Sequence, residues 1–259
     1  MRRVAALVLL VLPAAADDDA AKIKLLIARL RSPDKRARAT AAAELGDLGP
    51  RANGAINALA KALGDDDWWV RSRALEALKK IGPDAVPALV RAVAGSGKDR
   101  ADIMRLLDES FAGELKPHLR TVAGLLRDRD QSTRRHAAHA LGQQGEVAID
   151  VLIPALGARE EGAQEAAIEA LCGVGAIAID PLLQTLAGGS DRARAGAALA
   201  LGSLKASSAG EALVVALADK SQEVGGAAAR GLGAAGAVPE QAIPLLFEGL
   251  RSPNAPFRE

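Results

Sequence analysis

Apolar residues recur along most of the chain at helical spacing. A typical segment carries Val70, Ala74, Leu78 and Ile81, three or four positions apart. This spacing places the apolar side chains on one face of an amphipathic helix. Runs that alternate apolar and polar residues, which are typical of strands, are nearly absent. The pattern therefore predicts an all-α fold.

The helical pattern is part of a motif that is repeated along the chain. The repeated string is Ala-x-x-x-Leu-Gly-x-x-Gly, and we call its central leucine the anchor. Successive clear anchors lie 33, 63, 30, 30 and 31 residues apart, and a degenerate copy divides the interval of 63. The mean period of about 31 residues is typical of helical repeat proteins. The anchors are Leu45, Leu78, Leu107, Leu141, Leu171, Leu201 and Leu232.

Each period resolves into two short helices. The second helix contains the anchor and follows an Asp-rich turn, where Asp67 is a predicted N-cap. It ends four residues after the anchor at a glycine, which suits a left-handed C-terminal residue. These glycines are Gly49, Gly82, Gly145, Gly175 and Gly236. The first helix reads Ile-x-x-Leu-Leu-x-x-Leu and is predicted over 23–30, 56–63, 86–93, 149–156, 179–186 and 243–250.

Alanine stands four residues before the anchor in six repeats. Only a small side chain lets neighbouring helices approach closely there, so we expect these alanines to be packed between repeats. They are Ala41, Ala74, Ala137, Ala167, Ala197 and Ala228. This packing demand explains how the chain can be 49% hydrophobic with only 2% aromatic residues.

The repeats resemble a known family. The strings DDDWWVRSRALEALKKIG at 65–82 and DRDQSTRRHAAHALGQQG at 128–145 look like HEAT repeats. The short period and the ALGxxG signature are most similar to HEAT-like repeats of the phycobilisome-lyase type. The resemblance implies a right-handed α-solenoid of about seven and a half two-helix repeats over residues 17–259, the last of them incomplete.

The resemblance also implies a ladder that links neighbouring repeats through an arginine seven residues before the anchor and an aspartate six residues before that arginine. The matching residues are Arg38, Arg71, Arg134, Arg194, Asp65, Asp128 and Asp219. Other repeats depart from the motif at Gln164, Gly225, Ser32, Ala158 and Gly188. We therefore expect the later repeats to be less tightly linked.

The N-terminus has the pattern of an export signal. A basic start, the apolar run Val4 to Leu12 and small residues at Ala14 and Ala16 predict a secretory signal peptide over residues 1–16. The alternative is an apolar helix that caps the fold. The run is too short for a permanent span, so we expect a periplasmic or extracellular protein without a membrane span after cleavage.

Trp68 and Trp69, with Arg71 and Arg73, form the candidate protein-binding surface. Adjacent helical residues point about 100° apart, so both rings cannot be fully buried. An exposed tryptophan flanked by arginines is typical of a binding hot spot. The alternative is that one ring covers the open end of the hydrophobic layer between repeats.

Other reactive residues receive structural interpretations. His136 and His139 are three residues apart, but two ligands do not make a metal site, and the equivalent positions vary as on a solvated face. Cys172 occupies a position that is glycine in other repeats, which indicates packing. No catalytic or cofactor motif is found. The net charge of +1 and the few aromatic residues argue against nucleic acid.

Two regions break the pattern. The third repeat, over 95–113, lacks the alanine and glycine signature and is either a drifted copy or a second candidate surface. The chain also stops within a repeat, since 250–254 nearly copies 30–34. Truncation, sideways packing of the last helix, or self-association through this uncapped end are the three interpretations.

The leading functional prediction is an exported, noncatalytic scaffold that binds an unknown protein or peptide, without cofactor or metal. Its basis is the repeat architecture and the lack of a catalytic constellation. The alternative, implied by the resemblance alone, is a lyase or lyase subunit of the bilin-lyase type. Such an enzyme would need a tetrapyrrole pocket and would work inside the cell.

Overall fold

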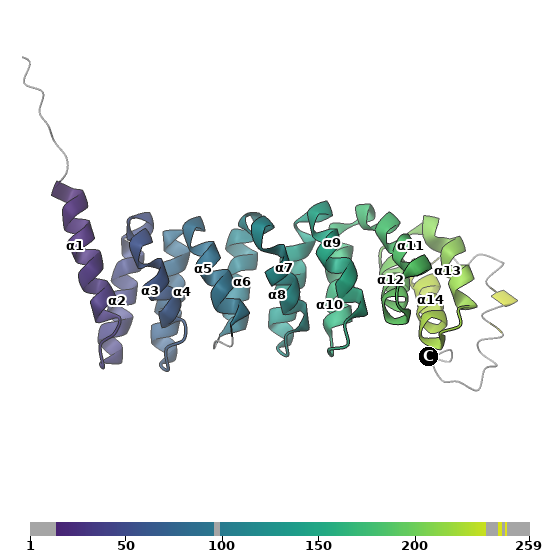
Figure 1. The fold of residues 1–259 in the computed structure, drawn as a ribbon, viewed down its shortest axis with the longest axis horizontal. Coiled ribbons are helices and arrows are strands. Elements are labelled where there is room, and N and C mark those ends of the chain that lie inside the picture. Colours follow the sequence, from purple (N-terminus) through teal and green to yellow (C-terminus); the bar gives the residue numbers. More distant parts are fainter. Residues whose placement is uncertain (1–13, 96–98, 237–242, 245–246, 248–259) are drawn as a thin grey trace, which may run out of the picture. The chain divides into compact units, whose positions relative to one another are not determined.

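A computed structural model describes residues 14–95, 99–236, 243–244 and 247. The described residues form helices joined by short turns, without a strand (Figure 1). They divide into two compact units, Met1–Ala88 and Leu89–Glu259. We describe each unit by itself.

The first unit contains two helix pairs. Helices α1 (Ala14–Arg29) and α2 (Lys35–Asp47) form one pair, and α3 (Ile56–Ala62) and α4 (Trp68–Ile81) form the next. The second helices, α2 and α4, pack directly against each other, and α1 and α3 each cover their own partner. The repeat contact in this unit is therefore made mainly by the second helices.

The second unit repeats this arrangement. Its second helices α6, α8, α10, α12 and α14 each pack against the next (Figure 1). The first helix α5 (Val86–Ala94) contains the boundary between the units. The other helices are α6 (Arg100–Phe111), α7 (Leu119–Gly124), α8 (Gln131–Gly142), α9 (Ile149–Leu152), α10 (Ala163–Val174), α11 (Ile179–Gly188), α12 (Asp191–Ser203), α13 (Gly210–Leu217) and α14 (Gln222–Ala235).

One first helix is much shorter than its apolar pattern predicts. The helix expected over 149–156 is α-helical only over Ile149–Leu152 and continues as the 3-10 segment Ile153–Gly157. Pro154 is the cause, because proline has no N–H to donate and its ring clashes with the carbonyl one turn earlier. The segment keeps its polar and apolar faces, while its backbone hydrogen bonds span three residues in place of four.

The predicted repeat core is confirmed. All seven anchor leucines and all six of the preceding alanines have 0% exposure. In the third repeat Ile103 takes the place of the alanine and is 1% exposed. Close approach is visible at Gly202, where an added Cβ would lie 2.4 Å from the Cα of Gly231 on the next second helix.

The predicted glycines follow the second helices with positive φ, although Gly82 and Gly175 have ψ of −155° and −151° and lie outside the left-handed helical region. All five have positive φ, from 57° at Gly49 to 101° at Gly82. The equivalent residue after Leu201 is Lys205, which also has a positive φ, of 51°. A side chain in this conformation is strained by about 1–2 kcal/mol. The fold thus imposes the turn even where the sequence has no glycine.

Some predictions concern residues outside the described part of the chain. Residues 1–13 of the predicted signal peptide and the incomplete repeat at 250–259 both lie there. Helix α1 begins at Ala14, before the predicted start at residue 23. Among the described helices, none alone is long and apolar enough to span a membrane, and one sharply bent pair, α10 with Ala176–Gly188, meets the length and composition criteria together.

Candidate functional site

The turns between first and second helices are held by a recurring arginine contact. The Arg38 Nη1 donates to the carbonyls of Ser32 and Pro33 at 2.9 and 3.1 Å. Its Nε and Nη2 donate to the two carboxylate oxygens of Asp65 in the next repeat, at 2.7 and 2.8 Å. Arg71 in turn donates to the Asp65 carbonyl at 2.9 Å. One arginine therefore closes its own turn and ties it to the next.

The aspartate of this ladder also shapes its turn. An oxygen of the Asp65 carboxylate accepts from the Asp67 N–H at 2.9 Å. Asp128 and Asp219 make the equivalent bonds to Asp130 and Ser221, at 2.9 and 2.8 Å. Hydrogen bonds from Arg38 are the main cause that holds the pKa of Asp65 below its ordinary value.

Further ladder contacts lie in the second unit. Arg194 Nη2 lies 2.8 Å from the Asp219 carboxylate, and Arg100 Nη2 lies 2.8 Å from that of Asp128. Arg100 was not among the predicted ladder residues, although it stands seven residues before the anchor Leu107. Applying the spacing rule to the degenerate repeat would have found it.

At Gln164, where the ladder arginine is absent, an amide takes its place. The Gln164 Nε2 donates to the carbonyls of Leu156 in its own repeat and Arg192 in the next, at 2.8 and 2.9 Å. Arg192 returns a hydrogen bond from its guanidinium to the Ala158 carbonyl. These two repeats are thus joined by bonds to the backbone in place of an ion pair.

Both tryptophans stand at the surface of the first unit. Trp68 is 69% exposed and Trp69 is partly exposed, so the prediction that both rings cannot be buried is confirmed. The two rings line a shallow hollow of about 450 Å³ together with Lys35, Arg36 and Asp67. The Asp67 side chain accepts from the Trp69 N–H at 3.0 Å, which caps α4 as predicted.

The arginines predicted beside the tryptophans have partners within the chain. Arg71 holds the turn through the carbonyls of Asp65 and Asp66. Arg73 pairs with Glu76 at 3.0 Å on the exposed side of α4. The positive charge next to Trp68 comes from the preceding repeat. Lys35 of that repeat forms an ion pair at 2.9 Å with Asp67, the residue before Trp68.

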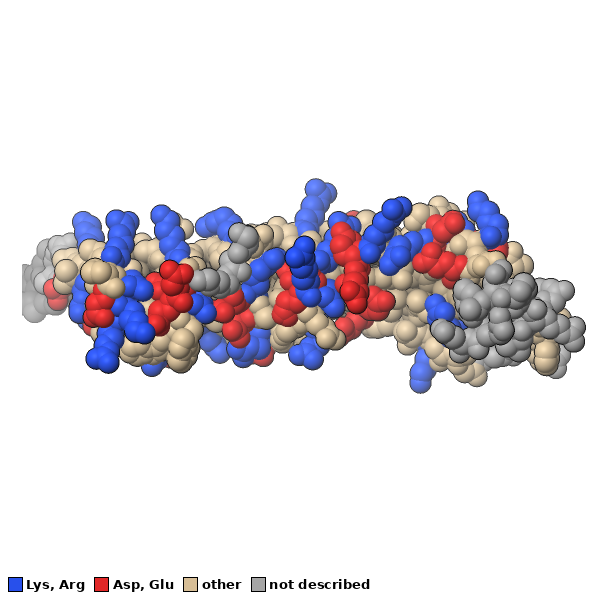
Figure 2. Space-filling model, turned by 90° about the horizontal axis from the view of Figure 1, so that it is seen from below, with Lys and Arg blue, Asp and Glu red and all other residues tan. Residues whose placement is uncertain are grey.

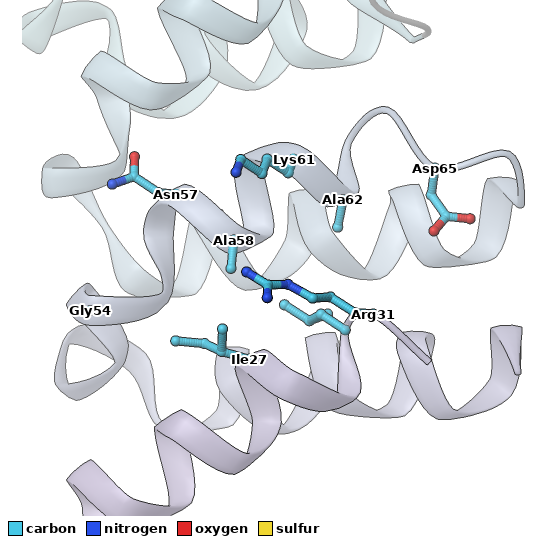
Figure 3. Close-up of a pocket in the computed structure, with 9 residues that line it drawn as sticks. Ile27, Arg31, Gly54, Asn57, Ala58, Lys61, Ala62 and Asp65 are labelled. Carbon is cyan, nitrogen blue, oxygen red and sulfur yellow. The ribbon is translucent and has the colours of Figure 1, made fainter. Parts of the chain in front are cut away.

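A groove of about 340 Å³ lies between α1 and α3 (Figure 3). Its floor is apolar, with Ile27, Leu30 and Ala58 among its lining residues. Figure 3 shows the Arg31 side chain extending across the groove toward Ala58, with Lys61 on the opposite helix. The sequence did not single out this groove, because it depends on how two first helices pack.

His136 and His139 make a contact that the sequence did not predict. Both bind one buried carboxylate, that of Asp108 on α6, through Nδ1 at 3.0 and 2.7 Å. Asp108 follows its anchor directly, where Gly46 faces Ala77 in another repeat. The degenerate repeat therefore carries a carboxylate at the tight contact, and two histidines of the next repeat satisfy it.

This contact corrects part of the interpretation of the histidines. The side chain of His139 is 64% exposed, as expected for a solvated face, whereas that of His136 is only 16% exposed. Among the described residues, no group of three or more His, Cys, Asp and Glu side chains could hold a metal ion. Cys172 is half-buried, and this burial is the main cause that raises the pKa of its thiol.

The geometry defines a class of protein, an all-α array of helix pairs that stack through their second helices. Comparison with known proteins agrees. A family model of HEAT repeats matches residues 23–107, 112–173 and 179–259. The chain belongs to the HEAT-repeat family, and the predicted family and α-solenoid fold are confirmed.

Several solved structures match most of the chain at low sequence identity. Human deoxyhypusine hydroxylase is 21% identical, with 95% of each chain covered and a TM-score of 0.39. The complex of CpcE and CpcF of phycocyanin lyase from Nostoc sp. is 23% identical, with 95% of this chain and 97% of that chain covered and a TM-score of 0.35. Kap121p bound to Pho4p is 15% identical, with 91% and 36% covered and a TM-score of 0.46. A search of curated protein sequences finds no match.

Proposed function

We propose that this protein is an exported, noncatalytic scaffold that binds another polypeptide through the surface around Trp68. HEAT repeats are a framework for protein interaction, which supports the general role. The exposed Trp68 ring carries the finer proposal. Covering the exposed part of a tryptophan, of order 150 Å², corresponds to about 4 kcal/mol of transfer free energy before the costs of association, and tryptophan is enriched at binding hot spots.

The surroundings of Trp68 favour binding over a role in covering the core. Trp68 is 69% exposed, so most of its side chain covers no other described residue. The hollow beside Trp68 combines the two rings with polar groups held in place by the Lys35–Asp67 ion pair. An amphipathic hollow of this kind suits a side chain of a partner.

The test is capture by the immobilised protein from the periplasmic or extracellular fraction, followed by comparison of variants. Trp68→Ala should lose the captured polypeptide and keep its thermal stability. Val215→Ala is the matched control, because Val215 is 75% exposed on the second unit. Equal capture by both variants would contradict the proposal. A coloured ligand that copurifies would instead favour the bilin-lyase alternative.

Export is supported by the pattern of residues 1–16. N-terminal sequencing of protein from the culture medium or periplasm should find Asp17 as the first residue, because cleavage is expected after Ala16. If the protein retains Met1 and stays in the cell, export is contradicted. The binding proposal is then still tested by the Trp68 variants.

A further inference from the structure

The groove between α1 and α3 carries positive charge that nothing in the described chain neutralises. Arg31 and Lys61 line its two sides, both are exposed, and neither forms an ion pair with a described residue. Lysine and arginine stems contribute to the apolar floor while their charged heads face solvent. The groove therefore offers two cations above an apolar base.

The acidic residues near this groove are already engaged. Asp65, which lines its end, is held by two hydrogen bonds from Arg38. Asp67 is paired with Lys35, and the neighbouring Asp66 also interacts within the protein. The groove thus presents two unpaired cations even though the whole chain has a net charge of only +1.

The groove and the Trp68 hollow follow one another along the same two turns. Arg31 and Asp65 line the groove, while Lys35, Asp67 and Trp68 line the hollow a few residues further along each turn. In Figure 2 the first unit, at the left, shows acidic side chains near the centre with basic side chains on either side. One extended segment could contact both parts.

We propose that the groove and the Trp68 hollow together bind an acidic, extended polypeptide segment. Its carboxylates pair with Arg31 and Lys61, and an apolar side chain of the same segment packs on Trp68. Guanidinium and ammonium groups bind carboxylates through charge-assisted hydrogen bonds, and the apolar floor accepts the stems of glutamate residues. The inference rests on the proposed function, since it names the partner of the same surface.

A polypeptide fits this surface better than a nucleic acid does. Single-stranded nucleic acids need a basic groove that follows the backbone and several aromatic platforms for successive bases. Here two unpaired cations line a groove of about 340 Å³, and the aromatic platform is limited to Trp68 and Trp69. An alternation of carboxylate and apolar contacts is characteristic of a peptide.

The test is fluorescence anisotropy with a labelled oligoglutamate peptide that carries one central phenylalanine. Wild-type protein should bind it, and the double variant Arg31→Ala/Lys61→Ala should bind about tenfold more weakly, as expected for two exposed ion pairs. Lys79→Ala is the matched control, because Lys79 is exposed on α4 and does not line the groove. The control should bind like wild type.

Further measurements with altered peptides and salt distinguish the chemistry of the partner. Replacing each glutamate of the peptide by glutamine should abolish the effect of the double variant, and raising the salt from about 0.1 to about 1 M should weaken binding. The inference is wrong if the oligoglutamate does not bind, if an oligolysine peptide or a single-stranded oligonucleotide binds more tightly, or if the double variant binds like wild type. These results would not affect capture that depends on Trp68, so the scaffold proposal is tested separately.

Discussion

The contact between α12 and α14 gives the sharpest stability prediction. Gly202 faces Gly231, and a Cβ at Gly202 would lie 2.4 Å from the Gly231 Cα and 2.5 Å from its carbonyl oxygen. Both neighbours are backbone atoms, so no side chain can rotate away. The substitution Gly202→Ala must push the two helices apart and loosen the packing of both repeats.

Gly233→Ala is the matched control. Gly233 also follows its anchor directly, but a Cβ there has no atom within 4 Å among those described. Both substitutions replace a helical glycine by alanine and gain about 0.5–1 kcal/mol from backbone entropy. The difference between the variants therefore isolates the cost of overpacking, which is about 1–3 kcal/mol.

Thermal unfolding followed by far-UV circular dichroism measures this difference. For a unit of this size, 1 kcal/mol shifts the Tm by about 2–4 °C. Gly202→Ala should melt about 2–12 °C below Gly233→Ala, and Gly233→Ala should melt at or above wild type. Equal melting temperatures for the two variants would refute the close approach of α12 and α14.

Three further outcomes are expected. Lys205→Gly should stabilise the protein by about 0.5–1 kcal/mol by relieving the positive φ, and a lower Tm would contradict this. Arg38 lowers the pKa of Asp65. The loss of unfolding free energy caused by Asp65→Asn should therefore be constant above about pH 4 and shrink as the pH falls through the lowered pKa. Denaturation at several pH values measures this loss. Cys172 should react with iodoacetamide more slowly in the folded protein than in urea, because its partial burial raises the pKa of its thiol, and equal rates would contradict this shielding.

Much of the repeat framework could be predicted from spacing alone. The anchor leucines, the alanines four residues earlier and the glycines with positive φ obey local rules of helix packing and termination, so each copy of the motif supports the others. The N-cap at Asp67 follows from the same local chemistry. The shortening of the first helix at 149–156 could not be read from the apolar pattern, because a 3-10 segment keeps the buried face while it changes the hydrogen bonding.

Contacts between different repeats were harder to predict. Asp108 and its two histidines each look like an isolated departure from the motif, and only the packing of α6 against α8 brings them together. The role of Gln164 is similar, because its amide reaches two carbonyls in different repeats. The groove at Arg31 is a property of two first helices and has no signature in either one alone.

Titration calorimetry of the captured polypeptide against wild type and Trp68→Ala measures whether the Trp68 surface is the binding site. If the Trp68 surface is the binding site, the variant should lose about 2 kcal/mol or more of binding free energy, which is about thirtyfold in Kd, while its Tm stays that of wild type. An unchanged Kd together with a lowered Tm would contradict the account and assign Trp68 to the stability of the fold.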